Sequence, residues 1–387
     1  MKERTTKLIG IVLAAGIFVF LCGTMNAAEA HHKKDGLTLQ ERLGKNLYFD
    51  TNLSEPAGQA CASCHHPFSG FADPDSAVPV SQGIIPDRFG NRNSPISAYA
   101  AYSPEPYRDE EGLFIGGQFW DGRAANLTEQ AMGPFLNPLE MNNPDKRTVL
   151  RKILRSNYAG LFARVCAKTL RNTDKAYRCA ADAIAAYERT DELNQFSSKF
   201  DCFVASAGDA GAVDMSTMDG YKNMGLSDKE LLGLALFNDP TKANCAACHL
   251  SSAPDDGSAP GAVFTDFSYD NLGVPPNPEL LALPGNAGWV DYGLGASLGD
   301  PNENGKVKVM TLRNIARSAP YMHNGIFNTL HEVVDFYNTA ADTTKWPAPE
   351  VSDNVNRDEL GNLGLSAEEI DAIVAFLYTL TDGYICQ

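Results

Sequence analysis

One five-residue pattern occurs twice and limits what this chain can fold into more than any other feature. Residues 61–65 read Cys-Ala-Ser-Cys-His and residues 245–249 read Cys-Ala-Ala-Cys-His. The two thiols of such a run can bond to the two vinyl groups of a haem, and the histidine that follows then reaches the iron from the same face. The pattern predicts two covalent c-type haems, held by Cys61, Cys64, His65, Cys245, Cys248 and His249.

A zinc site is the main alternative for these cysteines. Four cysteines in two Cys-x-x-Cys pairs can close a single zinc site, and one pair alone can be a redox pair. Here both pairs carry a histidine directly after the second cysteine, and Cys61 and Cys245 lie far apart in the chain. These two observations favour haem attachment over zinc or disulfides.

The N-terminus has the parts of a secretory signal. Basic residues precede an apolar run over residues 8–22, and residues 28–30, Ala-Glu-Ala, offer small side chains where a signal peptidase cuts. We predict a signal peptide over residues 1–30 and a mature chain that begins near His31, in the periplasm. An uncleaved anchor is the alternative, but the run is short for a membrane span, so no stable membrane insertion is expected.

Charge limits the partners of the protein. The sequence has 32 basic and 48 acidic residues, which gives a formal net charge of −16. Because nucleic acids and anionic membrane surfaces repel such a chain, we expect no nucleic-acid partner. A basic redox protein would instead be attracted to it.

The remaining cysteines predict disulfides. Of nine cysteines, Cys22 leaves with the signal peptide and four bind haem, so four remain. An even remainder in an oxidising compartment favours two disulfides. We expect Cys166 to pair with Cys179, because these two flank a short loop between helical stretches. The pairing of Cys202 and Cys386 is left open.

Apolar residues at three- and four-residue steps predict a mostly α protein. In each half, a helix precedes the cysteine run, which suggests that a small c-type cytochrome fold has been duplicated. A segment over residues 206–225, rich in Gly, Ala, Asp and Met, is typical of a linker. The main predicted helices span residues 37–49, 146–166, 175–189, 227–237 and 366–380.

The loop after His65 bears on what the first iron can bind. No histidine or methionine occurs between Pro67 and Gly117, and His66 cannot swing to the opposite face. We therefore expect an open coordination site on the first iron, which peroxide chemistry requires. Farther along, Trp120 and Glu140 could carry an electron and move a proton, although a core indole and a solvated carboxylate are the simpler interpretation.

Several motifs together resemble one family. Besides the two cysteine runs, the chain has Phe-Trp-Asp-Gly-Arg at 119–123, Asn-Pro-Leu-Glu-Met at 137–141, Leu-Arg-Asn at 312–314 and Pro-Tyr-Met-His-Asn-Gly at 320–325. In this order they resemble the bacterial dihaem cytochrome c peroxidases and their MauG branch, over nearly the whole mature chain. The resemblance implies a mostly α fold of two c-type cytochrome domains, each with one covalent haem.

The resemblance also implies iron ligands and catalytic residues. Tyr337 stands where MauG-like proteins place a tyrosine on the second iron and ordinary peroxidases place a methionine. His65 is then the ligand of an open haem, and His249 with Tyr337 binds a six-coordinate one. Glu140 is the distal acid/base, Gln130 and Pro134 line its pocket, and Trp120 connects the haems.

The family also holds a calcium ion between its domains, through oxygen ligands of the kind calcium prefers. Asn93, Ser318 and Pro320 fall at those positions, with Ser318 in place of the usual threonine. His323 lies close to the second haem in the motif and is interpreted as a structural hydrogen-bonder. At Ala243 the MauG branch has a tryptophan that passes electrons from its protein partner, so a surface relay lies elsewhere or is absent.

These expectations define a function with two alternatives. Residues 31–220 form the domain of the open haem and residues 221–387 that of the six-coordinate haem. Hydrogen peroxide reacts at the first iron, and the electrons come from a protein substrate or another electron donor, as in the MauG branch. The alternatives are an ordinary dihaem peroxidase, which takes electrons from a small redox protein, and an electron carrier in which neither iron is open.

Overall fold

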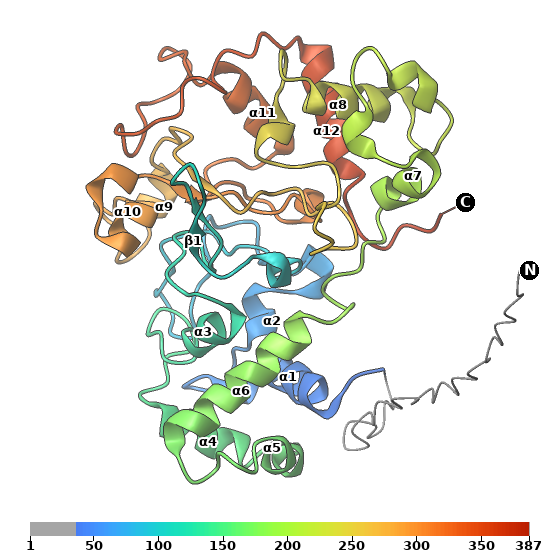
Figure 1. Ribbon diagram of the computed structural model, residues 1–387. Helices are drawn as coiled ribbons and strands as arrows, with labels where there is room; N and C mark the ends of the chain where they lie inside the picture. The colour runs from blue at the N-terminus through green and yellow to red at the C-terminus, as the bar shows by residue number, and fades with distance from the viewer. Residues whose placement is uncertain (1–35, 387) are drawn as a thin grey trace, which may run out of the picture.

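The computed structural model describes residues 36–386, which form twelve α-helices and two small antiparallel sheets joined by long loops (Figure 1). The predicted signal peptide lies outside the described residues. The helices are α1 Leu39–Phe49, α2 Cys61–Cys64, α3 Leu127–Met132, α4 Lys146–Ile153, α5 Ala159–Val165, α6 Thr173–Glu188, α7 Lys199–Ala207, α8 Asp228–Asn238, α9 Pro278–Ala282, α10 Gly293–Leu298, α11 Leu330–Thr339 and α12 Ala367–Tyr378. The strands are β1 Tyr107–Arg108, β2 Phe114–Ile115, β3 Tyr269–Asp270 and β4 Val307–Lys308. The protein is mostly α, as predicted.

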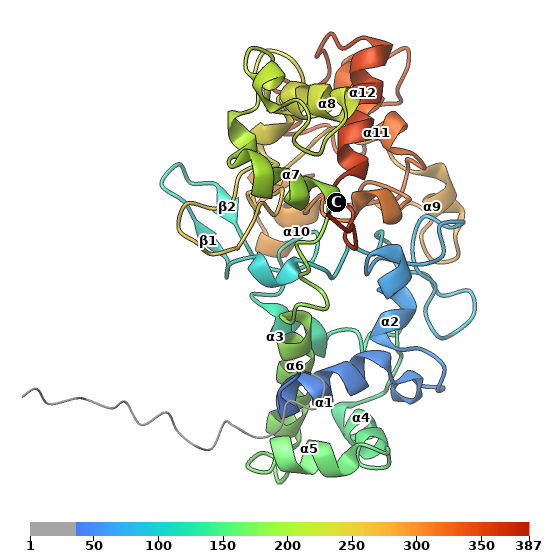
Figure 2. The same cartoon turned by 90° about the vertical axis from the view of Figure 1, so that its right-hand side faces the viewer.

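Two groups of helices lie at opposite ends of the molecule in both views (Figures 1 and 2). Helices α1 and α3 to α6 form one end, and α7, α8, α11 and α12 form the other. Each group has its own cluster of buried apolar side chains. Loops and the sheet of β1 and β2 lie between the two groups (Figure 2). No helix within residues 36–386 is long and apolar enough to cross a membrane.

In the first group, α1 packs directly against α6. Thr38 caps α1 and forms a reciprocal capping box with Glu41, which satisfies backbone donors that the helix end would otherwise leave free. The two helices approach closely at Gly44, where an added Cβ would lie 1.8 Å from the carbonyl oxygen of Ala183. Only glycine permits this crossing.

The second group repeats the arrangement. Helix α8, capped by Ser227 with Glu230, packs against α12, and Gly233 makes the close approach, since a Cβ there would lie 2.0 Å from the carbonyl oxygen of Ala372. In both halves, therefore, the helix before the cysteine run crosses the last helix of that half at a glycine. This repetition supports the interpretation of a duplicated fold.

Two predicted segments differ from the structure. The helix predicted over residues 146–166 is interrupted between α4 and α5, where the Ser156 hydroxyl donates to the carbonyl of Ile153 and competes with continued helix. The predicted linker is held against the second core, because Asn238 Nδ2 donates to the carbonyls of Ala210 and Val213.

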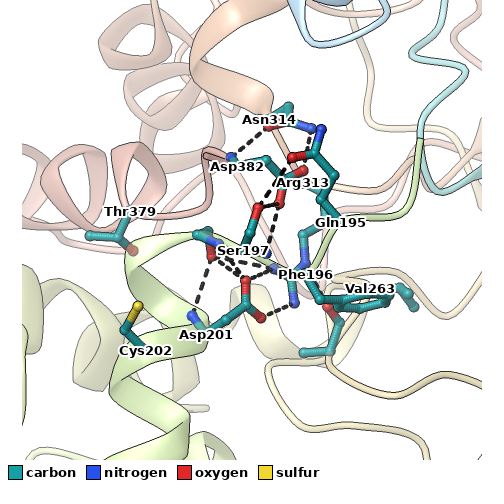
Figure 3. Close-up of polar contacts among 12 residues, drawn as sticks. Gln195, Phe196, Ser197, Asp201, Cys202, Val263, Arg313, Asn314, Thr379 and Asp382 are labelled. Atoms are coloured by element: carbon teal, nitrogen blue, oxygen red, sulfur yellow. Dashed lines mark hydrogen bonds and ion pairs between the residues drawn. The ribbon is translucent and has the colours of Figure 1, made fainter. Parts of the chain in front are cut away.

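A buried arginine joins α7 to the segment between β4 and α11 (Figure 3). Arg313 is 0% exposed, and its guanidinium forms hydrogen bonds to both carboxylate oxygens of Asp201, at 2.7 and 2.9 Å. Beside this pair, Asp382 accepts hydrogen bonds from Asn314 and from the hydroxyl of Tyr99 in the first half. The cluster of Arg313, Asp201, Asn314 and Asp382, called here the arginine junction, fastens the chain end to both halves.

The structure has two disulfides. Cys166 and Cys179, the expected pair, are bonded with their Cα atoms 6.0 Å apart. Cys202 of α7 is bonded to Cys386 near the chain end, with Cα atoms 5.6 Å apart. Both separations are ordinary for disulfides. The prediction of two disulfides, and of Cys166 with Cys179, is confirmed.

Candidate functional site

The first cysteine run forms the one-turn helix α2. The amide of His65 donates to the carbonyl of Cys61 at 2.9 Å, so the turn places both thiols and the imidazole at one cavity of about 380 Å³. Cys61 and Cys64 are not disulfide-bonded. Burial lowers the pKa of His65, and a neutral imidazole is the form that ligates iron. His66 accepts a hydrogen bond from the Phe68 amide and acts only locally.

The same cavity is lined by every residue predicted for the peroxide side of the first haem. Glu140, Gln130, Pro134 and Trp120 all contribute to its wall. Burial raises the pKa of Glu140, although a 2.6 Å hydrogen bond from Asn137 Nδ2 acts in the opposite direction. A raised pKa moves upward the pH range in which this carboxyl can both accept and return a proton.

Other side chains at this cavity matter for the state of the first iron. Met141 also lines it, but this side chain is buried within the first apolar core. The loop between residues 67 and 117 contributes no histidine or methionine to the wall. The lining is therefore compatible with the expected open coordination site.

The second cysteine run lines a cavity of about 200 Å³. Cys245 and Cys248 are free, and the amide of His249 donates to the carbonyl of Cys245 at 2.9 Å. The His249 Nδ1 lies 2.8 Å from the carbonyl oxygen of Phe264. Because this bond engages Nδ1, the ring presents Nε2 to the cavity, which is the usual arrangement of a ligating histidine.

Helix α11 brings Tyr337 to the second cavity. Burial raises the pKa of Tyr337 well above its usual value, so the phenol is protonated unless a cation binds the oxygen. Ferric iron is such a cation. Three other side chains of the same wall have nitrogen or sulfur that could ligate iron: Met310, Met322 and His323. His323 is the one with a polar partner, since its Nε2 lies 3.3 Å from Glu350 Oε2.

Trp120 lines both cavities. Its indole Nε1–H donates to the carbonyl of Asn93 at 2.8 Å. Its ring packs edge to face against the ring of His323, with the ring centroids 6.4 Å apart. Its own carbonyl accepts from the amide of Lys308 at 2.9 Å. Contacts from both halves of the chain therefore fix the indole between the two cysteine runs.

Charged residues cross between the halves close to Trp120. Arg92 forms salt bridges with Asp121 at 2.5 Å and with Asp291 at 2.6 Å. The amide of Asn93 donates to the carbonyl of His323 at 2.7 Å, and its Nδ2 donates to Pro79. The side-chain oxygen of Asn93 forms no hydrogen bond within the described residues, so it is available for a cation.

Two buried ionisable groups at the cavities were not predicted. Glu188, at the end of α6, lines the first cavity at 5% exposure, its Oε2 has no partner within the described residues, and burial raises its pKa to about 8. Lys308 lines the second cavity, also at 5% exposure. One signal was available for Glu188, because it lies four residues after Ile184 on the apolar face of its helix.

The residues present fit two covalent haems. Each cavity has two free thiols and a partly buried histidine whose pKa is lowered by burial, which favours the neutral imidazole. The lining of the second cavity is mostly apolar, as the face of a porphyrin requires. The donor set also excludes a shared zinc site, because the two pairs of cysteines line different cavities.

Known proteins resemble the whole chain. The family model of the di-haem cytochrome c peroxidases matches residues 39–209. The methylamine utilization protein MauG of Paracoccus denitrificans is 35% identical over 97% of this chain and 96% of its own length. The cytochrome c551 peroxidase of Nitrosomonas europaea is 29% identical over 98% of this chain and 92% of its own.

A solved structure agrees with these relatives. The diheme peroxidase BthA from Burkholderia thailandensis has a TM-score of 0.73 and 33% sequence identity, over 89% of this chain and 86% of its own. The fold, the two cysteine runs and the full-length relatives lead to the same assignment. This chain belongs to the di-haem cytochrome c peroxidase family, whose members are peroxidase-type oxidoreductases.

Proposed function

We propose that this protein uses hydrogen peroxide to oxidise a protein substrate or a redox partner, in the manner of the MauG branch. The observation that carries the proposal is the position of Trp120, which lines both cavities. Bound haems would supply the iron that reacts with peroxide and that holds the two oxidising equivalents. A shared indole then offers electrons a short path between the two sites.

In the first cavity, the chain supplies the groups that handle protons. Glu140 would take a proton from one oxygen of the peroxide and deliver it to the other, which would leave as water. Asn137 holds this carboxyl by the 2.6 Å hydrogen bond, and Gln130 lines the same wall. Because Glu140 must be ionised to accept the proton, the reaction rate rises with pH through a pKa that burial places above 4.5.

In the second cavity, Tyr337 and His249 are the proposed iron ligands. A phenolate stabilises ferric iron more than a methionine sulfur does, and therefore favours high oxidation states. This preference distinguishes a protein that stores oxidising equivalents from one that passes electrons on at once. Tyr337 is thus the residue that supports the MauG-like function.

Other assignments belong to the same proposal. Asn93, with Ser318 and Pro320, holds a calcium ion between the two groups of helices. The two domains remain a proposal over residues 31–220 and 221–387, although Phe200 and Phe203 of α7 pack in the second core. The side-chain oxygen of Asn93 and backbone carbonyls suit this ion. The protein acts in the periplasm after cleavage of residues 1–30.

The test is an EPR spectrum of the ferric protein, before and after one equivalent of peroxide. We expect one high-spin and one low-spin haem, and loss of both signals on addition of peroxide. In the Tyr337→Met variant the oxidised state should not persist. Tyr321→Phe is the matched control, because this tyrosine lines the same cavity and, within residues 36–386, its hydroxyl donates only to the carbonyl of Ile315. Two low-spin haems that do not respond to peroxide would refute the proposal.

Simple peroxide removal is the second candidate. It is favoured by the Nitrosomonas europaea cytochrome c551 peroxidase, which aligns over 98% of this chain. Steady-state turnover with reduced cytochrome c decides between the two. Sustained turnover with no stored oxidised state supports the ordinary peroxidase, and a long-lived oxidised state with slow turnover supports the MauG-like function.

A further inference from the structure

Lys308 is a buried cation with no counter-charge. Its side chain is 5% exposed, and no carboxylate of the described residues lies within salt-bridge distance of its amine. Arg313, which is also deeply buried, is paired with the carboxylate of Asp201. An uncompensated ammonium in the interior is costly, because little solvent remains to stabilise it.

The amine of Lys308 reaches across to the first half of the chain. Its Nζ donates to the hydroxyl of Ser103 at 2.5 Å and to the carbonyl of Gly117. Phe267 covers the amine with a ring centroid 5.4 Å away. Lys308 thus contacts the segment that leads into Trp120, while its own strand lines the second cavity.

The other ionisable groups around Lys308 do not neutralise it. Strand β3 pairs Tyr269 with Lys308, and the Tyr269 hydroxyl donates to the carbonyl of Gly116. Asp270 and Glu359 line the same cavity, and Asp121 lies near Tyr269. None of these carboxylates forms a salt bridge with Lys308, and burial alone lowers the pKa of its amine to about 7.

We propose that Lys308 is a redox-linked proton site. Its amine binds a proton when an electron enters the second haem and releases that proton to the solvent when the electron leaves. The inference rests on the proposed second haem, but not on the reaction with peroxide. The exchange balances charge, because one electron and one proton arrive or depart together. The partly exposed hydroxyl of Ser103 gives the proton a route out of the interior.

The physical basis is linkage between two charges in a poorly solvated wall. An added electron attracts a proton to the amine, and by reciprocity a protonated amine raises the reduction potential of the haem. If one proton accompanies one electron, the potential falls by about 59 mV for each pH unit through the range in which Lys308 titrates. Outside this range the potential is constant.

The experiment is spectroelectrochemical titration of the low-spin haem in the dihaem protein, between about pH 5.5 and pH 8.5, on either side of the pKa of about 7 that burial gives Lys308. We expect the wild-type potential to fall as the pH rises. Lys308→Met should give a constant potential near the wild-type value at high pH, and Lys308→Arg a constant potential near the value at low pH. Lys306→Met, which removes a lysine paired with Glu303, should keep the wild-type slope.

The outcomes separate this inference from the proposed function. A wild-type potential that does not change with pH would overturn the inference, and so would an unchanged slope in Lys308→Met. If Lys308→Met does not fold, the titrations of the wild type and of Lys308→Arg still test whether Lys308 is the redox-linked proton site. Haem content, measured as the pyridine haemochrome, shows independently whether the second haem is present. Absence of that haem would contradict the proposed function itself.

Discussion

Removal of the negative charge in the arginine junction should destabilise the protein strongly. In Asp201→Asn, the side chain keeps its shape and one acceptor oxygen but no longer compensates Arg313. The guanidinium is 0% exposed and lies within 6 Å of the ring centroids of Tyr99, Phe196, Phe200 and Phe264. These rings interact favourably with the cation but cannot replace a carboxylate.

The expected loss follows from the burial of the pair. Breaking a buried ion pair by removing one partner costs about 3–5 kcal/mol, because the other charge stays in the interior. Asp201 is 18% exposed, so some solvent reaches the site, and we expect the lower end, about 3 kcal/mol. Burial by itself would raise the pKa of Asp201, but the hydrogen bonds and charge of Arg313 outweigh it and lower the pKa.

Urea unfolding, followed by far-UV circular dichroism, measures the difference. Folding lowers the pKa of Asp201. The ionised carboxylate therefore stabilises the protein at pH values above its usual pKa of 3.8, and this stabilisation is lost as the pH falls through the pKa of the folded state. The variant and the wild type should therefore differ at pH 7 and converge in acid. Asp371→Asn, at an exposed pair with Lys229, is the control and should change stability by less than about 1 kcal/mol. A loss below that size in Asp201→Asn would refute the reasoning.

Four further predictions concern the helix crossing and the cavities. Gly233→Ala should lower the free energy of unfolding by about 1–3 kcal/mol, because its Cβ would meet the Ala372 carbonyl; an unchanged urea midpoint would contradict this close contact. Glu188→Gln should stabilise the protein by about 2–4 kcal/mol at pH 9 and by little at pH 4. Burial raises the pKa of Glu188, so ionisation of the buried carboxyl lowers the stability of the wild type as the pH rises. Thermal unfolding at both pH values tests the sign. Glu140→Gln should slow the reaction with peroxide by about 10²–10⁴-fold in stopped-flow measurements, and a wild-type rate would remove Glu140 from the chemistry. Trp120→Phe should keep both haem spectra but slow electron transfer between the sites by at least about tenfold, equivalent to about 1.4 kcal/mol of barrier; equal rates would mean that electrons take another route.

Much of the site could be predicted because its residues are close in sequence. A Cys-x-x-Cys-His run occupies a single turn, so the short-range backbone geometry that places Cys61, Cys64 and His65 together is fixed locally. Capping boxes are equally local, and the helix that begins after Ser227 starts where Glu230 predicts it. The two disulfides also followed from a count of cysteines in an oxidising compartment.

The remaining features depend on contacts between distant segments. In the sequence, Lys308 is an ordinary lysine between two valines. It becomes buried only when its strand packs against the residues around Ser103 and Gly117. Arg313 stood within a recognised motif, but its partner Asp201 lies in α7, more than a hundred residues earlier. No periodicity or spacing in the sequence predicts these contacts between distant residues. The composition of residues 206–225 predicted a linker. It could not show that the side chain of Asn238 forms a hydrogen bond to this segment.

The bond between Cys202 and Cys386 turns the second half of the chain into a closed covalent ring. The ring spans 184 residues of sequence and contains the second cysteine run, the second cavity and the strand of Lys308. A protease that cuts one surface loop inside this ring cannot release a fragment, because the two pieces stay joined through sulfur. The half of the protein that would store oxidising equivalents is thus the half that survives a single backbone break in one piece.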